Sequence, residues 1–221
     1  MNDAYLGMLS WLADPAQWSG PTSIPARTGI YLAQCAATLV LASAVALPVG
    51  LWIGHTGRCR AFVVPLTSAM RSLPTLGMLL LISLWLGIGL KAPLLALSLL
   101  AIPPILSGAY SGIESVDPQL AHAARSVGFT EWQVLIHVEI PLGLPVIVSG
   151  LRAASVQILA TWTVAAYLPI EGLGRYLIDG LAMQDYAMML AGSAIIIFLE
   201  IIINAMLGLA ERLAIKATHR R

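Results

Sequence analysis

The sequence predicts an all-α membrane protein with about five transmembrane helices. Of its 221 residues, 58% are hydrophobic and only 10% are charged, and the mean hydropathy is +0.85. Soluble domains carry roughly 25% charged residues, so the solvent of this chain is predicted to be lipid. Several apolar runs approach the about 20 residues that a helix needs to cross the hydrocarbon core. The net charge of +1 gives no electrostatic reason to expect nucleic-acid binding.

The N-terminal residues 1–27 are predicted to form an external or interfacial segment. Trp11 and Trp18 suit the membrane surface. No Lys or Arg precedes the first apolar residues, so the segment does not read as a cleavable signal. A transmembrane domain is then predicted over residues 28–213, followed by a basic cytoplasmic tail over residues 214–221.

Five apolar runs account for the predicted spans. They are Thr28–Ile53, Phe62–Leu86, Ala92–Gly112, Leu142–Leu168 and Met188–Leu209. The second run is interrupted by Pro65, Arg71 and Pro74. Because Pro74 lacks an N–H and clashes with the preceding turn, it is predicted to kink this span. Broken membrane helices are tolerated where they line a cavity or meet other helices, so a pathway-lining bend and a packing kink both remain open.

Basic residues near the span ends predict the orientation. Placing the Arg58/Arg60 loop in the cytoplasm puts seven basic residues inside and three outside, which favours an external N-terminus and a cytoplasmic C-terminus. The other inside residues are Arg125, Arg212, Lys216, Arg220 and Arg221, and the outside residues are Arg27, Lys91 and Arg175. Of the two cysteines, Cys35 is predicted to be buried and Cys59 to be a reduced cytoplasmic thiol.

The polar stretch Asp117–Pro145 lies between two predicted spans and is the most informative part of the chain. Asp117, followed by a proline, predicts a helix start, because its side chain accepts from free N–H groups. Gly128 is placed to end this helix with a positive φ. Thr130 and Gln133 predict a capping box on a second helix. A docking surface for another protein and a hairpin packed on its own spans both fit this pattern.

Several further local features are expected around this stretch. Small residues are predicted on one side of the first helix. The apolar face of the second helix is predicted to consist of Trp132, Leu135, Ile136 and Val138, and Pro141 and Pro145 are expected to mark the start of the fourth span. His55, His137 and His219 are expected to be solvated polar residues, since no metal-ligand spacing joins them.

The stretch resembles the cytoplasmic coupling segment of ABC-importer permease subunits. The family's pattern is Glu-Ala-Ala, three residues, Gly, nine residues, then Ile-x-Leu-Pro. The chain reads His122-Ala123-Ala124, three residues, Gly128, nine residues, then Val138-Glu139-Ile140-Pro141. The spacing matches without a gap, and His122 replaces the glutamate. This replacement removes an acidic contact that the family pattern offers to the ATPase.

The wider chain, roughly residues 28–213, is similar to the osmoprotectant-uptake permeases of the glycine betaine, choline and carnitine type. Arg71–Leu76 resembles the segment that opens their second span, and Ser115–Pro118 resembles the run before their coupling helix. Ile170–Leu181 resembles the glycine-rich outer hairpin between their last two spans.

This resemblance implies a type I ABC-importer permease fold with a cytoplasmic coupling helix in the cell inner membrane. Separate cytoplasmic ATPase subunits would bind ATP and Mg, and this chain would bind no cofactor and no metal. A second permease copy or a related permease, and an external substrate-binding protein, are the other expected partners. The residues expected to contact the ATPase are Asp117, Ala121, His122, Ala123, Ala124, Arg125, Gly128, Phe129, Val138, Ile140 and Pro141.

A second group of residues is predicted to line the transport pathway or its outer gate. The group consists of Pro74, Trp85, Thr161, Trp162, Gly172, Gly174 and Glu200. Aromatic faces attract quaternary ammonium groups, but packing or an interfacial aromatic belt also explains the tryptophans. A carboxylate inside a membrane faces a protein interior or a cavity, so Glu200 either pairs with Arg152 or helps to pass a cation.

Other functions remain open from the sequence. The chain contains no phosphate-binding Gly-x-x-x-x-Gly-Lys-Ser/Thr loop and no hydrolase motif. An ABC permease for another amino acid or zwitterion is the nearest alternative. A secondary transporter would require intramembrane acid pairs or inverted repeats, and a membrane scaffold would explain only the docking stretch.

Overall fold

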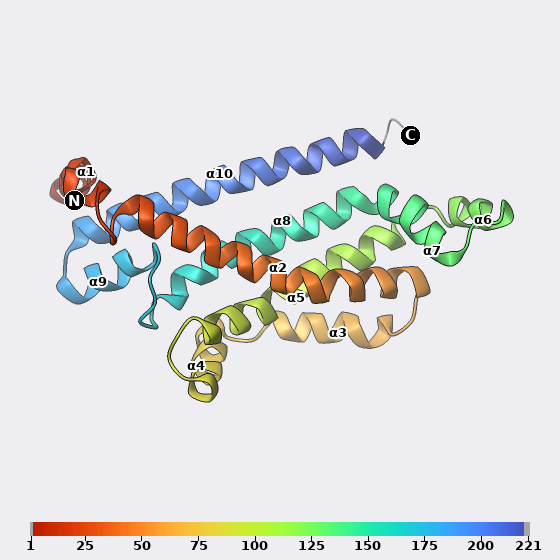
Figure 1. The fold of residues 1–221 in the computed structure, drawn as a ribbon, viewed down its shortest axis with the longest axis horizontal. Coiled ribbons are helices and arrows are strands. Elements are labelled where there is room, and N and C mark those ends of the chain that lie inside the picture. The colour runs from red at the N-terminus through yellow and green to blue at the C-terminus, as the bar shows by residue number, and fades with distance from the viewer. Residues whose placement is uncertain (1, 219–221) are drawn as a thin grey trace. The chain divides into compact units, whose positions relative to one another are not determined.

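The computed structural model describes residues 2–218, and every regular element in this range is helical (Figure 1). The helices are α1 (Asn2–Ala13), a 3-10 helix (Pro15–Trp18), α2 (Ile24–Thr56), α3 (Arg60–Arg71), α4 (Thr75–Leu86), α5 (Lys91–Glu114), α6 (Pro118–Ser126), α7 (Glu131–Val134), a π-helix (Leu135–Glu139), α8 (Ile140–Ala165), α9 (Arg175–Met183) and α10 (Tyr186–Thr218). The all-α prediction is confirmed. The predicted roles of His219, Arg220 and Arg221 lie outside the described residues.

Four helices of the described range are long and apolar enough to cross a membrane. They are α2, α5, the continuous run Glu131–Ala165 and α10. A fifth span is present when α3 and α4 are counted as one broken span. The expectation of about five spans is met on this count.

The second span is not the single helix Phe62–Leu86 that the sequence predicts. Helix α3 ends at Arg71, and the N–H of the capping residue Ser72 donates to the Ala69 carbonyl at 3.1 Å. Pro74 then precedes α4 with φ −68° and ψ 119°, an extended conformation that a helix interior does not contain. Because proline has no N–H for the helical ladder, the chain restarts here instead of bending within one helix.

The fourth span also differs from its prediction. Pro141 and Pro145 both lie inside a helical run that begins at Glu131, so neither marks the start of the span. A π-helical turn precedes Pro141, and the Ile140 N–H donates to the Leu135 carbonyl. Such turns shift the hydrogen-bond pattern of a helix, and prolines are tolerated in membrane helices when local adjustments supply other partners.

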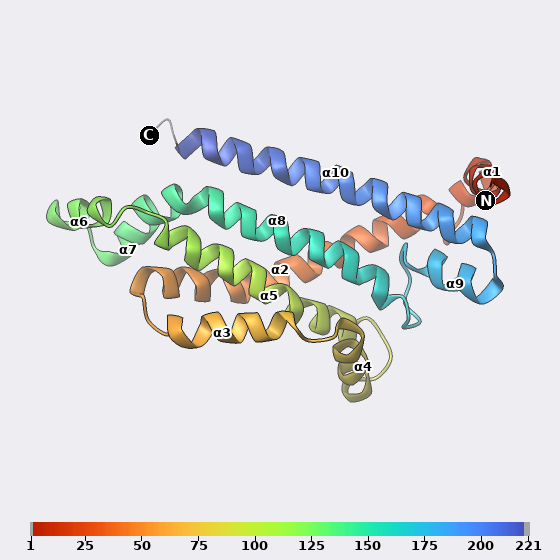
Figure 2. The ribbon, with the colours of Figure 1, turned by 180° about the vertical axis from the view of Figure 1, so that it is seen from behind.

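The chain forms two compact units. Unit 1 consists of Met1–Thr38, Pro74–Leu97 and Gln157–Ile203. Within it, α1 and α9 both lie near the start of α10 in Figure 1 and Figure 2. The Trp11 and Tyr176 rings meet edge to face at 5.3 Å, and the Tyr176 hydroxyl donates to the Thr22 carbonyl at 2.8 Å. These contacts fasten α1 and the segment before α2 to α9.

Unit 2 consists of Leu39–Leu73, Ser98–Val156 and Asn204–Arg221. Its helices approach closely at glycines: a β-carbon added to Gly108 would lie 2.6 Å from the Gly150 Cα, and one added to Gly54 would lie 2.7 Å from the Ile113 Cβ. Small residues permit such backbone approach in membrane helices. In this unit α5 therefore packs against both α2 and α8, and the stretch between α5 and α8 is held at both its ends.

Candidate coupling site

Helix α6 begins and ends as the sequence predicts. The Asp117 carboxylate accepts from the Gln119 N–H at 2.9 Å, which caps the helix start. Gly128 has φ +95°, and the Phe129 N–H then donates to the Ala124 carbonyl at 3.1 Å. Glycine adopts this left-handed conformation without a steric penalty. The two end signals are therefore confirmed, and they present α6 as a separate short helix.

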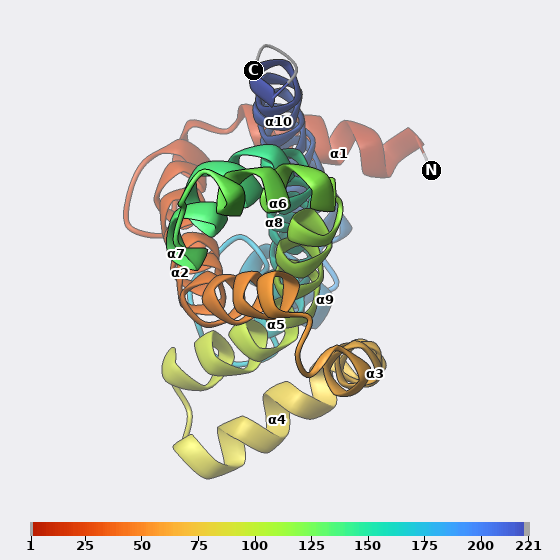
Figure 3. The same cartoon turned by 90° about the vertical axis from the view of Figure 1, so that its right-hand side faces the viewer.

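The exposed surface of α6 is different from the predicted face of small residues. Ala121 is buried, Ala123 is exposed, and Ala124 is half-buried. Because residues two apart in a helix point to nearly opposite sides, the alanines cannot share one face. Figure 3 looks onto α6 and α7. The large apolar side chains exposed on these helices and on the turn between them are Leu120, Val127, Phe129 and Trp132.

Helix α7 is capped as expected but buries other residues. The Thr130 hydroxyl accepts from the Gln133 N–H, and the Gln133 side chain accepts from the Thr130 N–H at 2.8 Å, so the capping box is confirmed. Val134 and Leu135 are buried, whereas Trp132 is 69% exposed. The predicted apolar face is wrong in part, because α7 lasts one turn before the π-helix changes the register of the side chains.

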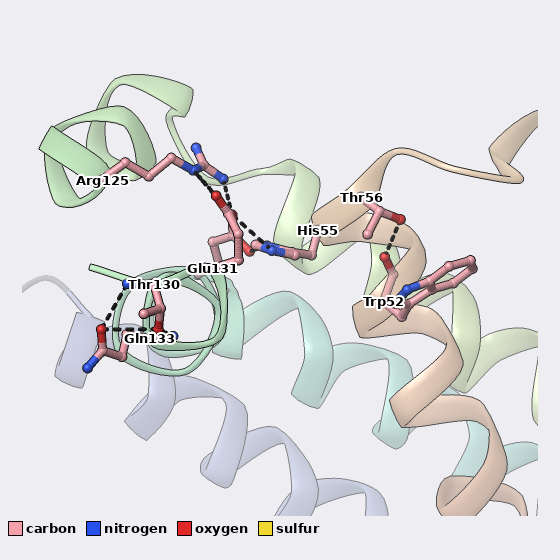
Figure 4. Close-up of polar contacts among 8 residues, drawn as sticks. Trp52, His55, Thr56, Arg125, Thr130, Glu131 and Gln133 are labelled. Atoms are coloured by element: carbon pink, nitrogen blue, oxygen red, sulfur yellow. Dashed lines mark hydrogen bonds and ion pairs between the residues drawn. The ribbon is translucent and has the colours of Figure 1, made fainter. Parts of the chain in front are cut away.

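Four charged or titratable side chains join this stretch to the end of α2, and three of them, His55, Arg125 and Glu131, are labelled in Figure 4. The Arg125 guanidinium donates to both carboxylate oxygens of Glu131, at 2.9 and 2.9 Å. The second Glu131 oxygen lies 3.3 Å from His55 Nε2, and His55 Nδ1 lies 2.6 Å from Glu139 Oε2. We call these four residues the His55 network. It connects α6, α7, the π-helix and α2 within unit 2.

The buried part of the His55 network contributes more to the stability of the fold than the exposed part. Glu131 is 62% exposed, and surface ion pairs contribute about 0–1 kcal/mol. The hydrogen bonds that the Arg125 guanidinium donates to Glu131 raise the pKa of Arg125, which stays charged in any case. Glu139, in contrast, is 8% exposed and His55 is 12% exposed. A buried carboxylate requires a charged or hydrogen-bonding partner, and the His55 ring supplies it.

The His55 ring lies between two acids. Both ring nitrogens face carboxylate oxygens, which accept but do not donate hydrogen bonds when ionised. A neutral imidazole has one N–H and can donate to one of the two acids, whereas an imidazolium can donate to both. The ring therefore connects Glu131 of α7 with Glu139 of the π-helix.

Sequence reasoning missed this role of His55, which is not a solvated residue. The available signal was Glu139, an acid set among Val138, Ile140 and Pro141 at the start of a span. An acid in such an apolar setting needs a partner. Val138 and Ile140 are themselves half-buried, so they support this part of the site instead of forming its surface.

The predicted pathway residues all lie in unit 1, but the structure gathers only three of them. Trp162, Gly172 and Gly174 line one small cavity of about 10 Å³, together with Tyr31, Gln34 and Glu171. That volume holds about one water molecule, so it cannot admit a solute in this conformation. Trp162 is buried and donates from Nε1 to the Thr38 hydroxyl at 2.9 Å.

The remaining predicted pathway residues lie elsewhere in unit 1. Pro74 is exposed at the start of α4, Trp85 is 92% exposed near its end, and Glu200 is half-buried on α10. The Thr161 hydroxyl bonds to the Gln157 carbonyl of its own helix at 2.8 Å. These side chains do not share the cavity of Trp162.

The predicted Arg152–Glu200 pair is wrong. The Arg152 guanidinium donates to the Asn204 side chain at 2.9 Å and to the Glu211 carboxylate at 2.8 Å. Gly208 lies between these two partners on α10, and a β-carbon there would lie 3.3 Å from the guanidinium carbon. Residues three to four apart share a helix face, so Asn204, Gly208 and Glu211 form one receiving surface for Arg152.

Known transport proteins are similar to this chain over most of its length. The model of the family described as binding-protein-dependent transport system inner membrane components matches residues 46–216. The carnitine transport permease protein OpuCB of Listeria monocytogenes is 33% identical over 180 residues, covering 81% of this chain and 83% of that protein. The glycine betaine/carnitine/choline permease protein OpuCB of Bacillus subtilis is 30% identical over 186 residues, covering 84% and 86%.

Solved structures agree with the predicted type I ABC-importer permease fold. An inward-facing MetNI methionine ABC transporter chain matches with a TM-score of 0.72 at 21% identity, covering 83% of this chain and 92% of that chain. An amino acid ABC transporter crystallised with histidines matches with a TM-score of 0.70 at 20% identity, covering 93% and 97%. The fold prediction is therefore confirmed.

Proposed function

The chain belongs to the family of binding-protein-dependent transport system inner membrane components, and on this premise we propose that it imports a compatible solute as the permease subunit of an ABC importer. The solute class proposed is glycine betaine, carnitine, choline or a similar quaternary amine. The observation that carries this proposal is the 30–33% identity to permeases of these solutes over about four fifths of the chain.

In this proposal α6 is the contact with a cytoplasmic ATPase. The supporting features are its separate capping, its position between α5 and α8, and the exposed Leu120, Val127 and Phe129 on and beside it. Exposed apolar side chains that lie close together are typical of protein–protein interaction sites. His122 stands where the family pattern has a glutamate, so an acidic contact with the ATPase is replaced by an imidazole.

The His55 network gives this contact a route into the spans. A movement of α6 is passed through Arg125 and Glu131 to His55 on α2, and through Glu139 to the start of α8. Since the glycine contacts of unit 2 also bind α5 to both α2 and α8, these three helices would move together. ATP and Mg would bind to the partner subunits and drive this movement.

The proposal includes the remaining partners and the orientation. A second permease copy or a related permease completes the pathway, and an external binding protein delivers the solute. The excess of basic residues beside α2, α6 and α10 supports a cytoplasmic C-terminus and an external N-terminus. On this topology α6 lies in the cytoplasm and the hairpin that contains Gly172 lies outside.

Copurification and reconstitution test the proposed function together. The chain would be isolated from its native membrane in mild detergent, and the proteins that accompany it would be identified by mass. We expect an ATP-binding subunit and a binding protein, and ATP-dependent uptake of labelled glycine betaine, carnitine or choline by vesicles that contain the complex. A lone chain that moves solute without ATP would overturn the proposal.

A further inference from the structure

A groove in unit 2 combines one guanidinium with three hydroxyl groups. It has a volume of about 230 Å³ and is lined by Arg71 at the end of α3, Ser107 and Ser111 on α5, and Ser149 on α8. Gly108 and Gly150, which approach each other closely, also line it. The lining contains no acidic residue, so the charge of Arg71 is not balanced within the groove.

The polar groups of this groove are not used by the fold. Within the described residues, neither the Arg71 guanidinium nor the hydroxyls of Ser107, Ser111 and Ser149 make a hydrogen bond or an ion pair. Hydroxyls elsewhere in the spans behave differently. Those of Ser83, Ser155 and Ser193 each bond to a carbonyl four residues earlier in the same helix. The groove therefore offers donors without acceptors.

The position of Arg71 along α3 indicates that these free donors face a substrate pathway. Helix α3 starts at Arg60, beside the loop that the proposed orientation places at the cytoplasmic surface. At about 1.5 Å per residue, Arg71 lies about 16 Å further along the helix, near the middle of a hydrocarbon core about 30 Å thick. A charge at such depth faces a water-filled cavity or a partner and indicates a substrate pathway.

We propose that this groove is a transit site for the carboxylate of a zwitterionic solute. Arg71 pairs with the carboxylate, as guanidinium groups do in a planar, two-bond geometry, and the three serine hydroxyls donate further hydrogen bonds. The lining includes no aromatic side chain, so the quaternary ammonium is not recognised here. The inference rests on the proposed function and narrows it: glycine betaine and carnitine have a carboxylate, and choline does not.

Ligand-observed saturation-transfer NMR on the assembled complex without its binding protein tests this site, because the method detects weak ligands. We expect a signal for glycine betaine that acetate displaces and tetramethylammonium does not, and only a background signal for choline. Arg71→Gln should weaken glycine betaine binding about ten- to hundredfold, and Arg71→Lys should weaken it less. Arg58→Gln removes one positive charge from an exposed loop and should change nothing.

The same variants should then be compared in transport with the binding protein present. A loss confined to carboxylate-bearing solutes, with unchanged ATPase association, supports the site. Equal signals for glycine betaine and choline, or equal binding by wild type and Arg71→Gln, would overturn the proposed carboxylate site. The proposed function would still stand if the complex took up a quaternary amine in an ATP-dependent way. An Arg71→Gln effect that follows the anionic lipid content of the vesicles and is the same for every solute would assign the groove to a lipid phosphate instead.

Discussion

His55 Nδ1 lies 2.6 Å from Glu139 Oε2, although 84 positions separate the two residues in the chain. One side chain belongs to the last turn of α2, and the other ends the π-helix that leads into α8. This contact links the first span to the stretch between α5 and α8. Through Glu131, which contacts both His55 and Arg125, α2 is also connected indirectly to α6.

His55→Ala should destabilise the chain and reduce the transport obtained per ATP hydrolysed. The substitution leaves the buried Glu139 carboxylate without its partner, which costs about 3 kcal/mol when a charged group is involved. Thermal unfolding in detergent measures the first effect, and ATPase activity against uptake measures the second. His137→Ala, which removes an exposed imidazole bonded to a backbone carbonyl, is the matched control.

The double variant His55→Leu/Glu139→Met separates the pair from its parts. Replacing both members of a buried pair with apolar residues can be nearly neutral, so stability should recover relative to His55→Ala. Coupling should not recover, because the polar link from Glu131 to α8 is gone. Recovery of coupling together with stability would show that the His55 network serves the fold alone.

Gly128→Val should abolish ATPase association while the spans still insert. Gly128 has φ +95°, and nothing lies within 4 Å of a β-carbon placed there, so the cost is one of backbone conformation. That conformational cost is about 1–2 kcal/mol for a non-glycine residue and is smaller for Asn. Copurification of the ATPase checks the series Gly, Asn, Val.

Gly20 provides the control for this series. It has φ +101° and also has nothing within 4 Å of an added β-carbon, but it lies in the loop before α2. Gly20→Val imposes a similar strain far along the chain from α6 and should leave ATPase association unchanged. Equal losses from both glycine variants would argue against a specific role for α6.

Glu211→Gln should lower stability more than Glu200→Gln. Glu211 accepts from Arg152 at 2.8 Å, whereas none of the hydrogen bonds or ion pairs of the described residues joins Arg152 to Glu200. Because both partners of this pair are partly exposed, the expected loss is about 1 kcal/mol. Thermal unfolding of the two single variants compares their losses of stability. A larger loss for Glu200→Gln than for Glu211→Gln would contradict the structure.

Thiol labelling should report the proposed orientation. Cys59 is exposed in the loop between α2 and α3, and Cys35 is buried. A membrane-impermeant maleimide should leave Cys59 unmodified in intact cells and label it after the membrane is opened. Ser19→Cys in a Cys59→Ser background should show the reverse. Labelling of Cys59 in intact cells would contradict the proposed orientation and indicate the opposite one.

Much of the fold was predictable because its signals are local. Hydropathy locates α2, α5, α8 and α10, and single side chains such as Asp117 and Gly128 mark the ends of α6. Each of these signals acts within a few residues, so no knowledge of distant contacts is needed. The sequence predicts the position of the break at Pro74 correctly. It predicts a kink within one helix, whereas the structure has two separate helices, because a proline can either kink a helix or end it.

The candidate site was less predictable because its contacts join distant residues. His55 gives no local sign that it will meet Glu139, and nothing in the sequence around Arg152 identifies Glu211 as its partner. Which acid faces Arg152 depends on the rotation of α10, which Gly208 and Asn204 reveal only in the folded chain. Helix rotation and the π-helical shift after α7 lie beyond what periodicity can predict.

Photo-crosslinking from α6 tests the central claim of this account most directly. A photoreactive phenylalanine analogue would replace Phe129, which is 41% exposed beside α6, and in a second variant Tyr167, which is 60% exposed in unit 1. Both substitutions exchange one aromatic ring for another. We predict that illumination of native membranes joins position 129, but not position 167, to an ATP-binding subunit. Capture of that subunit from position 167 alone, or from neither position while ATP-driven uptake proceeds, would contradict the assignment of α6 as the coupling helix.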